Sequence, residues 1–120
     1  MPFGRRKASA PAGRIEVTRY GGRPVVDPSE ETLREMVRDL AHDTEEHLVV
    51  GLLADRSGQT YVQVLHDAGG RWVVEHRAGS EETHAHAVVP DVDVAAAIVV
   101  AWAAGDPGWH DLADWRDGEL

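Results

Sequence analysis

Residues 60–79 read TYVQVLHDAGGRWVVEHRAG, and this stretch predicts the β-hairpin around which the fold is arranged. The runs Tyr61–His66 and Arg71–Arg77 are rich in the β-branched and aromatic residues that favour strands. Between them, Gly69 and Gly70 can adopt the positive φ angles that a tight reversal needs. Side chains alternate along a strand, so the second run has two faces: Trp72, Val74 and His76 on one, and Val73, Glu75 and Arg77 on the other. The first face is predicted to lie in the core.

The flanking segments supply two helices and further strands. A helix is predicted from Asp27 as N-cap, with Pro28 at its first position, to about Ala41. A second, apolar helix spans Val92–Ala104. Other strands are predicted from alternating or continuous apolar runs at Ile15–Tyr20, Leu48–Ala54, Thr83–Val89 and, briefly, Trp115–Arg116. This order predicts an α+β fold, in which an antiparallel sheet of about five to six strands carries two helices packed on one face.

The composition is that of one ordinary globular domain. We expect residues 1–13 to form a disordered basic tail and residues 14–120 a single domain. The chain has no cysteine, and no apolar run approaches the roughly 18–20 residues that cross a bilayer. Because the basic start is not followed by the apolar core of a secretory signal, the sequence favours a cytoplasmic protein with no membrane association.

Charge is unevenly distributed along the chain. Residues 15–120 hold all 21 acidic residues but only eight of the twelve basic ones, a net charge of −13. Such a body repels nucleic acid and attracts basic partners. Solubility alone would also account for this charge.

Histidines offer the main candidate for chemistry. His84 and His86 share one face of a strand, and His76 on the neighbouring strand could join them in a metal site. The alternative is a solvated sheet face with polar histidines. No glycine-rich phosphate loop is present and no catalytic constellation is recognisable, so the sequence predicts neither an enzyme nor a cofactor.

Charged and aromatic residues suggest a protein-binding surface instead. Glu75 and Arg77 share a strand face and lead towards Glu81 and Glu82, whereas Trp109 and Asp111 lie in an acidic C-terminal segment. Aromatic residues surrounded by charge are common anchors of interfaces. Two alternatives remain open: the Glu75–Arg77 pair is an ordinary surface pair, and the tryptophan covers the open end of the sheet.

The stretch from Thr60 onward resembles immunity family one of the bacterial polymorphic-toxin systems. The resemblance lies in YVQV at 61–64, GRWVVEHRAG at 70–79, WAAGDP at 102–107 and Trp115, and covers about half of the chain. It implies an α+β domain that binds a toxin domain, such as a deaminase or nuclease, and blocks its active site. Toxins that process nucleic acid are generally basic around the substrate groove, so their charge is complementary to that of the acidic body.

The leading hypothesis is therefore a non-enzymatic protein that neutralises a cognate, basic toxin. The residues predicted to contact the toxin are Glu75, Arg77, Glu81, Glu82, Trp109 and Asp111. One alternative is a metal- or small-molecule-binding domain that uses His76, His84 and His86. Another is a housekeeping domain of unknown role, which could form a homodimer through an exposed sheet edge.

Overall fold

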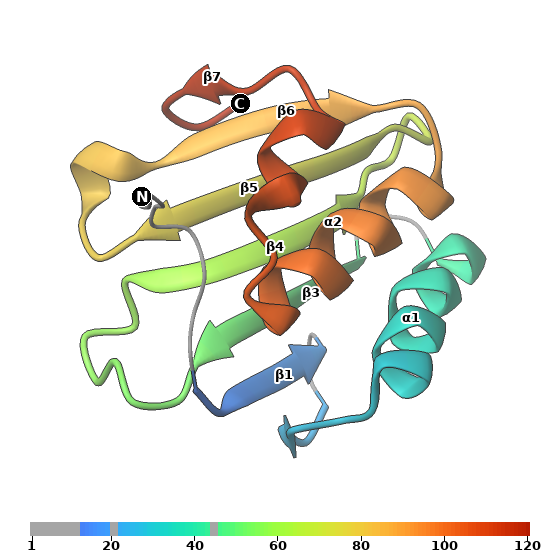
Figure 1. Ribbon diagram of the computed structural model, residues 1–120. Helices are drawn as coiled ribbons and strands as arrows, with labels where there is room; N and C mark the ends of the chain where they lie inside the picture. Colours follow the sequence, from blue (N-terminus) through green and yellow to red (C-terminus); the bar gives the residue numbers. More distant parts are fainter. Residues whose placement is uncertain (1–12, 20–21, 44–45) are drawn as a thin grey trace.

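The hairpin at residues 60–79 forms the centre of a seven-stranded antiparallel sheet in the computed structural model, which describes residues 13–19, 22–43 and 46–120 (Figure 1). The strand order is β2-β1-β3-β4-β5-β6-β7. The strands are β1 (Ile15–Arg19), β2 (Val25–Val26), β3 (Glu46–Leu52), β4 (Thr60–His66), β5 (Trp72–Ala78), β6 (Ala85–Val89) and β7 (Arg116–Asp117). The helices are α1 (Glu30–Asp39) and α2 (Val92–Ala104), and short 3-10 turns are η1 (Leu40–His42), η2 (Glu81–Thr83) and η3 (Pro107–Leu112).

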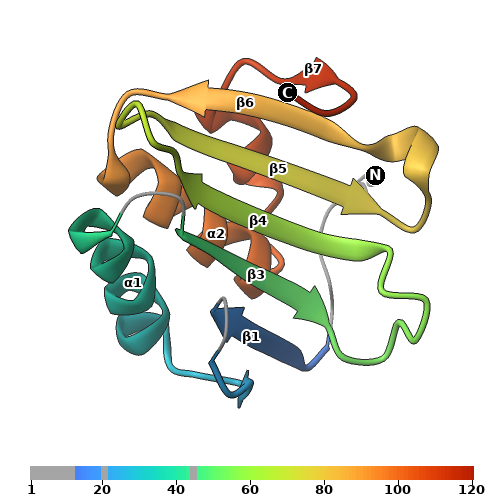
Figure 2. The same cartoon turned by 180° about the vertical axis from the view of Figure 1, so that it is seen from behind.

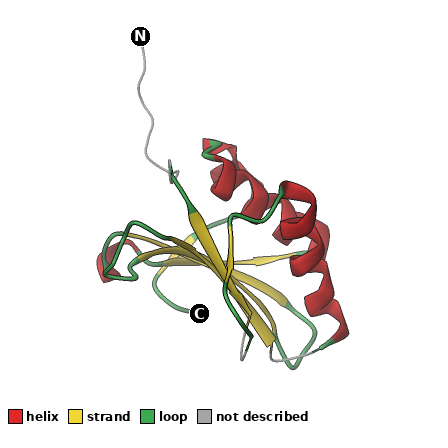
Figure 3. Ribbon diagram, turned by 90° about the horizontal axis from the view of Figure 1, so that it is seen from below, coloured by secondary structure: helices red, strands yellow, loops and turns green. Residues whose placement is uncertain are grey.

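Both α-helices pack on the same face of the sheet, which confirms the predicted α+β class (Figure 3). The sheet has more strands than the five to six expected, because the two-residue β2 was not predicted. Neither α-helix is long and apolar enough to cross a membrane, and no other helix of the described residues is. The predicted tail lies outside the described residues, except for Gly13.

The core lies between the helices and the inward face of the strands. Its sheet side alternates along each strand as predicted, and its buried members include Val17, Leu48, Val50, Val62, Val64, Trp72 and Val74. Helix α1 adds Leu33 and Val37, and α2 adds Ile98, Val99 and Trp102. Since α2 is apolar nearly all round, it occupies the more enclosed position, packed against α1, β4, β5 and β6.

The start of α1 differs from the prediction. Ser29, not Asp27, is the N-cap, and its side chain accepts a hydrogen bond from the backbone N–H of Thr32 at 3.1 Å. Asp27 has a positive φ of 48° and instead binds β1, where its carboxylate accepts from the Ile15 backbone N–H and from Arg14 Nε, both at 2.9 Å. The hydrogen bond from the Arg14 side chain, followed by that from the Ile15 backbone, holds the pKa of Asp27 below its usual value. A contact distant in sequence therefore decides which residue caps the helix.

Replacing Ser29 with alanine is expected to lower the free energy of unfolding by about 1 kcal/mol, because the Thr32 N–H loses its acceptor. Urea unfolding followed by circular dichroism would measure this. Ser80→Ala is the matched control: Ser80 precedes η2 but its side chain makes no capping hydrogen bond, so a change within about 0.5 kcal/mol is expected. Equal losses at the two serines would contradict the assignment of the cap.

Candidate functional site

The face of the sheet opposite α1 and α2 is covered by neither α-helix (Figure 2). Glu75 lies near its middle, opposite Gln63 of β4 on one side and His86 of β6 on the other. An apolar row made by Leu65, Val73 and Val88 crosses the same face beside it. We call this surface the open face.

Five polar side chains meet on the open face and form what we call the open-face cluster: Gln59, Tyr61, Glu75, Arg77 and His84. At its centre, His84 Nδ1 lies 3.0 Å from Arg77 Nε, and His84 Nε2 lies 2.5 Å from Glu75 Oε1. Arginine Nε can only donate, so Nδ1 must accept and carries no proton. His84 is therefore neutral in this arrangement, with its proton on Nε2 donated to the Glu75 carboxylate.

Arg77 is held from several sides. Its Nη1 donates to Gln59 Oε1 at 2.6 Å, and its guanidinium carbon lies 5.6 Å from the centre of the Tyr61 ring, within the range of a cation–π contact. Burial raises the pKa of Tyr61, Arg77 opposes this, and the charges of Glu75 and Glu119 add to it. Tyr61 is thus a neutral phenol near pH 7.

The cluster is recessed although no α-helix covers it. The His84 side chain is 6% exposed and that of Glu75 is 15% exposed. Both ring nitrogens of His84 are occupied, so the imidazole has no free lone pair with which to act as a general base. The second oxygen of Glu75, Oε2, has no hydrogen-bond donor among the described residues. The arrangement is suited to presenting a fixed carboxylate to another molecule.

The predicted contact residues are distributed over both sides of the molecule. Glu75 and Arg77 are brought together, through His84, and Glu81 and Glu82 lie exposed in η2, between them and His84 in the chain. Asp111 is exposed in η3, which packs against α2 on the helix side.

The prediction that Trp109 contacts a partner is wrong, because its side chain is only 2% exposed. Its ring packs edge-on against His76 at 4.7 Å between centroids and against Trp115 at 5.5 Å, and stacks on His110 at 3.7 Å. The alternative reading, in which the tryptophan covers the end of the sheet, is the one that the structure supports.

The three histidines considered for a metal do not converge. His76 lies on the helix side among Trp109 and Trp115, His84 lies in the open-face cluster, and His86 donates from Nδ1 to the Gly118 carbonyl at 2.7 Å. Within residues 13–19, 22–43 and 46–120, no group of three or more His, Asp or Glu side chains is placed to hold a metal ion. Nothing in this geometry supports the metal alternative.

The bridging role of His84 was not predicted. The signal lay in the alternation that put Glu75 and Arg77 on one face and in the histidine at the start of the next strand, but the β5–β6 register was needed to join them. The edge strands β2 and β7 contain two residues each, and β7 pairs only with Ala85 and His86 of β6, so a homodimer paired at a sheet edge stays a prediction.

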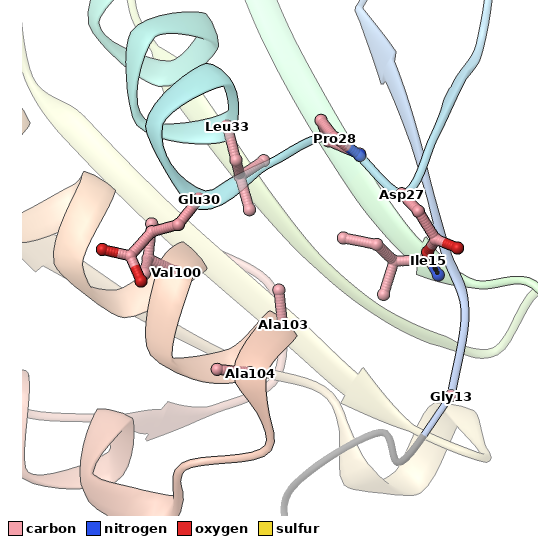
Figure 4. A pocket seen from close by; sticks show the side chains of 9 residues that line it. All are labelled: Gly13, Ile15, Asp27, Pro28, Glu30, Leu33, Val100, Ala103 and Ala104. Carbon is pink, nitrogen blue, oxygen red and sulfur yellow. Dashed lines mark hydrogen bonds between the residues drawn. The ribbon is translucent and has the colours of Figure 1, made fainter.

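A separate cavity of about 210 Å³ lies where the start of α1 and the end of α2 approach β1 (Figure 4). Its apolar wall includes Ile15, Leu33 and Val100, and the carboxylates of Asp27 and Glu30 lie at its border. Both carboxylates already accept hydrogen bonds from arginines, Asp27 from Arg14 and Glu30 from Arg34 at 3.2 Å. The cavity is an apolar hollow whose neighbouring charges are paired.

Comparisons with protein-family models, with curated proteins and with solved structures gave no match. Function therefore has to be inferred from the residues of the chain itself.

Proposed function

We propose that the chain is an immunity protein that acts in the cytoplasm, binds a cognate toxin of the deaminase or nuclease class, and neutralises it through the open face. The observation that carries the proposal is the recessed cluster of Glu75, His84 and Arg77 on a sheet face without an α-helix. The resemblance of residues 60–115 to immunity family one gives the class of partner.

A role in binding explains the open-face cluster better than a contribution to folding stability does. Burying charged groups is costly, and a partly buried ionic network gives little net stability compared with apolar side chains of the same volume. A fixed polar group beside an apolar row is, however, the common composition of a protein interface. Leu65 and Val88 supply the accessible part of that row, and Val88 is 49% exposed, whereas Val73 between them is buried.

Charge supports a basic protein as the partner. The body carries −13 over residues 15–120, and its field would speed the approach of a basic surface and repel nucleic acid.

Within the open-face cluster, both nitrogens of His84 are engaged, which favours a recognition role over acid–base catalysis.

The test is co-expression with the product of the adjacent gene, together with binding of the two purified proteins. The proposal expects that product to inhibit growth when expressed alone, and growth to be restored when this chain is present. The proposal would be contradicted by a product that is harmless when expressed alone, or that is equally toxic with and without this chain.

The association rate with that product is expected to fall about tenfold when salt is raised from about 50 to 500 mM, because salt screens the attraction between opposite net charges. The dissociation rate should change much less. Surface plasmon resonance at several salt concentrations measures both rates. An association rate independent of salt would show that the acidic body plays no part in recognition.

A further inference from the structure

The Glu75 carboxylate is partly buried and, although Arg77 is near, it is not paired with an arginine. Six carboxylates in the described residues lie within 3.3 Å of an arginine nitrogen: those of Asp27, Glu30, Asp43, Asp67, Asp93 and Asp114. Glu75 has no such contact, although Arg77 shares its face of β5. The neutral imidazole of His84 stands between the two and holds them apart.

The geometry points to Glu75 as the acceptor of a guanidinium or ammonium group of the partner, with His84 as its positioning residue; this rests on the proposed function. His84 holds Oε1 of Glu75 and so fixes the direction of Oε2. Arg77 makes no ion pair with the carboxylate; its Nε and Nη1 donate to His84 and Gln59 instead.

The surroundings of Glu75 favour a cation from outside the chain. The residues directly opposite it on the neighbouring strands are Gln63, which is uncharged, and His86, which is anchored to the Gly118 carbonyl. With the side chain only 15% exposed, a charge-assisted hydrogen bond there is screened less than one at the surface. A basic side chain from the partner therefore fits this carboxylate in both charge and donor chemistry.

Three substitutions distinguish the role of Glu75 as acceptor from that of His84 as its positioning residue. Glu75→Gln removes the charge and keeps the shape. His84→Asn places an amide oxygen where Nδ1 stood, so it can still accept from Arg77 but does not reach Glu75. His84→Gln places an amide N–H near the position of Nε2, so it can still donate to Glu75. Glu35→Gln, at an exposed site on α1, is the matched control for the loss of one carboxylate.

The affinity for the purified product of the adjacent gene is then measured by isothermal titration calorimetry. We expect Glu75→Gln to weaken it about 100-fold, as for truncation of a partly buried charge pair. His84→Asn should weaken it by about tenfold or more, whereas His84→Gln and Glu35→Gln should stay within about threefold. The double variant Glu75→Gln with His84→Asn should bind no more weakly than Glu75→Gln alone, because His84 acts through Glu75.

Thermal unfolding of each variant shows whether it is folded. If Glu75→Gln does not fold, the comparison of the two His84 variants still decides the matter. A wild-type affinity in Glu75→Gln, or equal losses in His84→Asn and His84→Gln, overturns this inference but leaves the proposed function standing, since the wild-type protein still binds. Failure of the wild-type protein to bind overturns both.

Discussion

Replacing Trp109 with alanine is expected to lower the free energy of unfolding by about 3–5 kcal/mol, the range for truncation of a buried large aromatic side chain. Trp109 is 2% exposed and contacts the rings of His76, His110 and Trp115. Its removal would leave a cavity between η3 and the sheet and loosen the C-terminal segment. Urea unfolding monitored by circular dichroism gives the free energy.

Leu112→Ala provides the control in the same turn. Leu112 is 43% exposed, so its truncation should cost less than about 1 kcal/mol. A loss below 1 kcal/mol for Trp109→Ala would mean that the indole is not part of the core. Where the Trp109 variant is folded, its affinity for the purified product of the adjacent gene should equal that of the wild-type protein, because the indole is buried and cannot contact a partner.

Lowering the pH from 7 to 4 is expected to remove about 3 kcal/mol of stability through His76 alone. Burial lowers the pKa of His76 to about 4, and a positive charge on His110 acts in the same direction. The unfolded imidazole has a pKa of about 6.5, so the unfolded chain binds a proton at pH values where the native chain does not. The contribution of His76 is therefore complete above about pH 6.5 and is lost as the pH falls towards 4, at about 1.4 kcal/mol per pH unit.

His76→Phe isolates this effect, because phenylalanine keeps an aromatic ring between Trp109 and Trp115 and cannot be protonated. The free energy of unfolding of both proteins is measured from pH 4 to 7. The difference between them should change by about 3 kcal/mol over this range, with the wild-type protein losing more. Parallel curves would show that His76 is accessible to protons in the native state.

The alternation of side chains in residues 60–79 was enough to predict the sheet centre. It separated Trp72 and Val74 from Glu75 and Arg77, and the register Tyr61↔Arg77 and Val64↔Val74 agrees with a turn at Gly69–Gly70. This succeeded because strand periodicity and turn chemistry are local properties of the chain.

The failures all concern contacts between residues distant in sequence. Asp27 and Ser29 are both good N-cap residues, and only the contact of Asp27 with Arg14 and Ile15 decides between them. The acidic neighbours of Trp109 in the sequence favour a surface position, yet its ring packs against His76, more than thirty residues earlier in the chain. His84 joins Glu75 and Arg77 only through the pairing of β5 with β6.

The central claim is that the partner binds the open face. Two double variants with the same change in net charge test it: Glu81→Lys with Glu82→Lys beside the open-face cluster, and Glu31→Lys with Glu35→Lys on α1. All four side chains are exposed. The dissociation constant for the purified product of the adjacent gene is measured at about 150 mM salt, where the screening length is about 8 Å.

We expect the Glu81/Glu82 variant to bind at least about tenfold more weakly than the wild-type protein, mainly through a slower association rate. The Glu31/Glu35 variant should remain within about threefold, because α1 packs on the opposite side of the sheet. Equal losses in the two variants, or a larger loss in the α1 variant, would contradict binding through the open face.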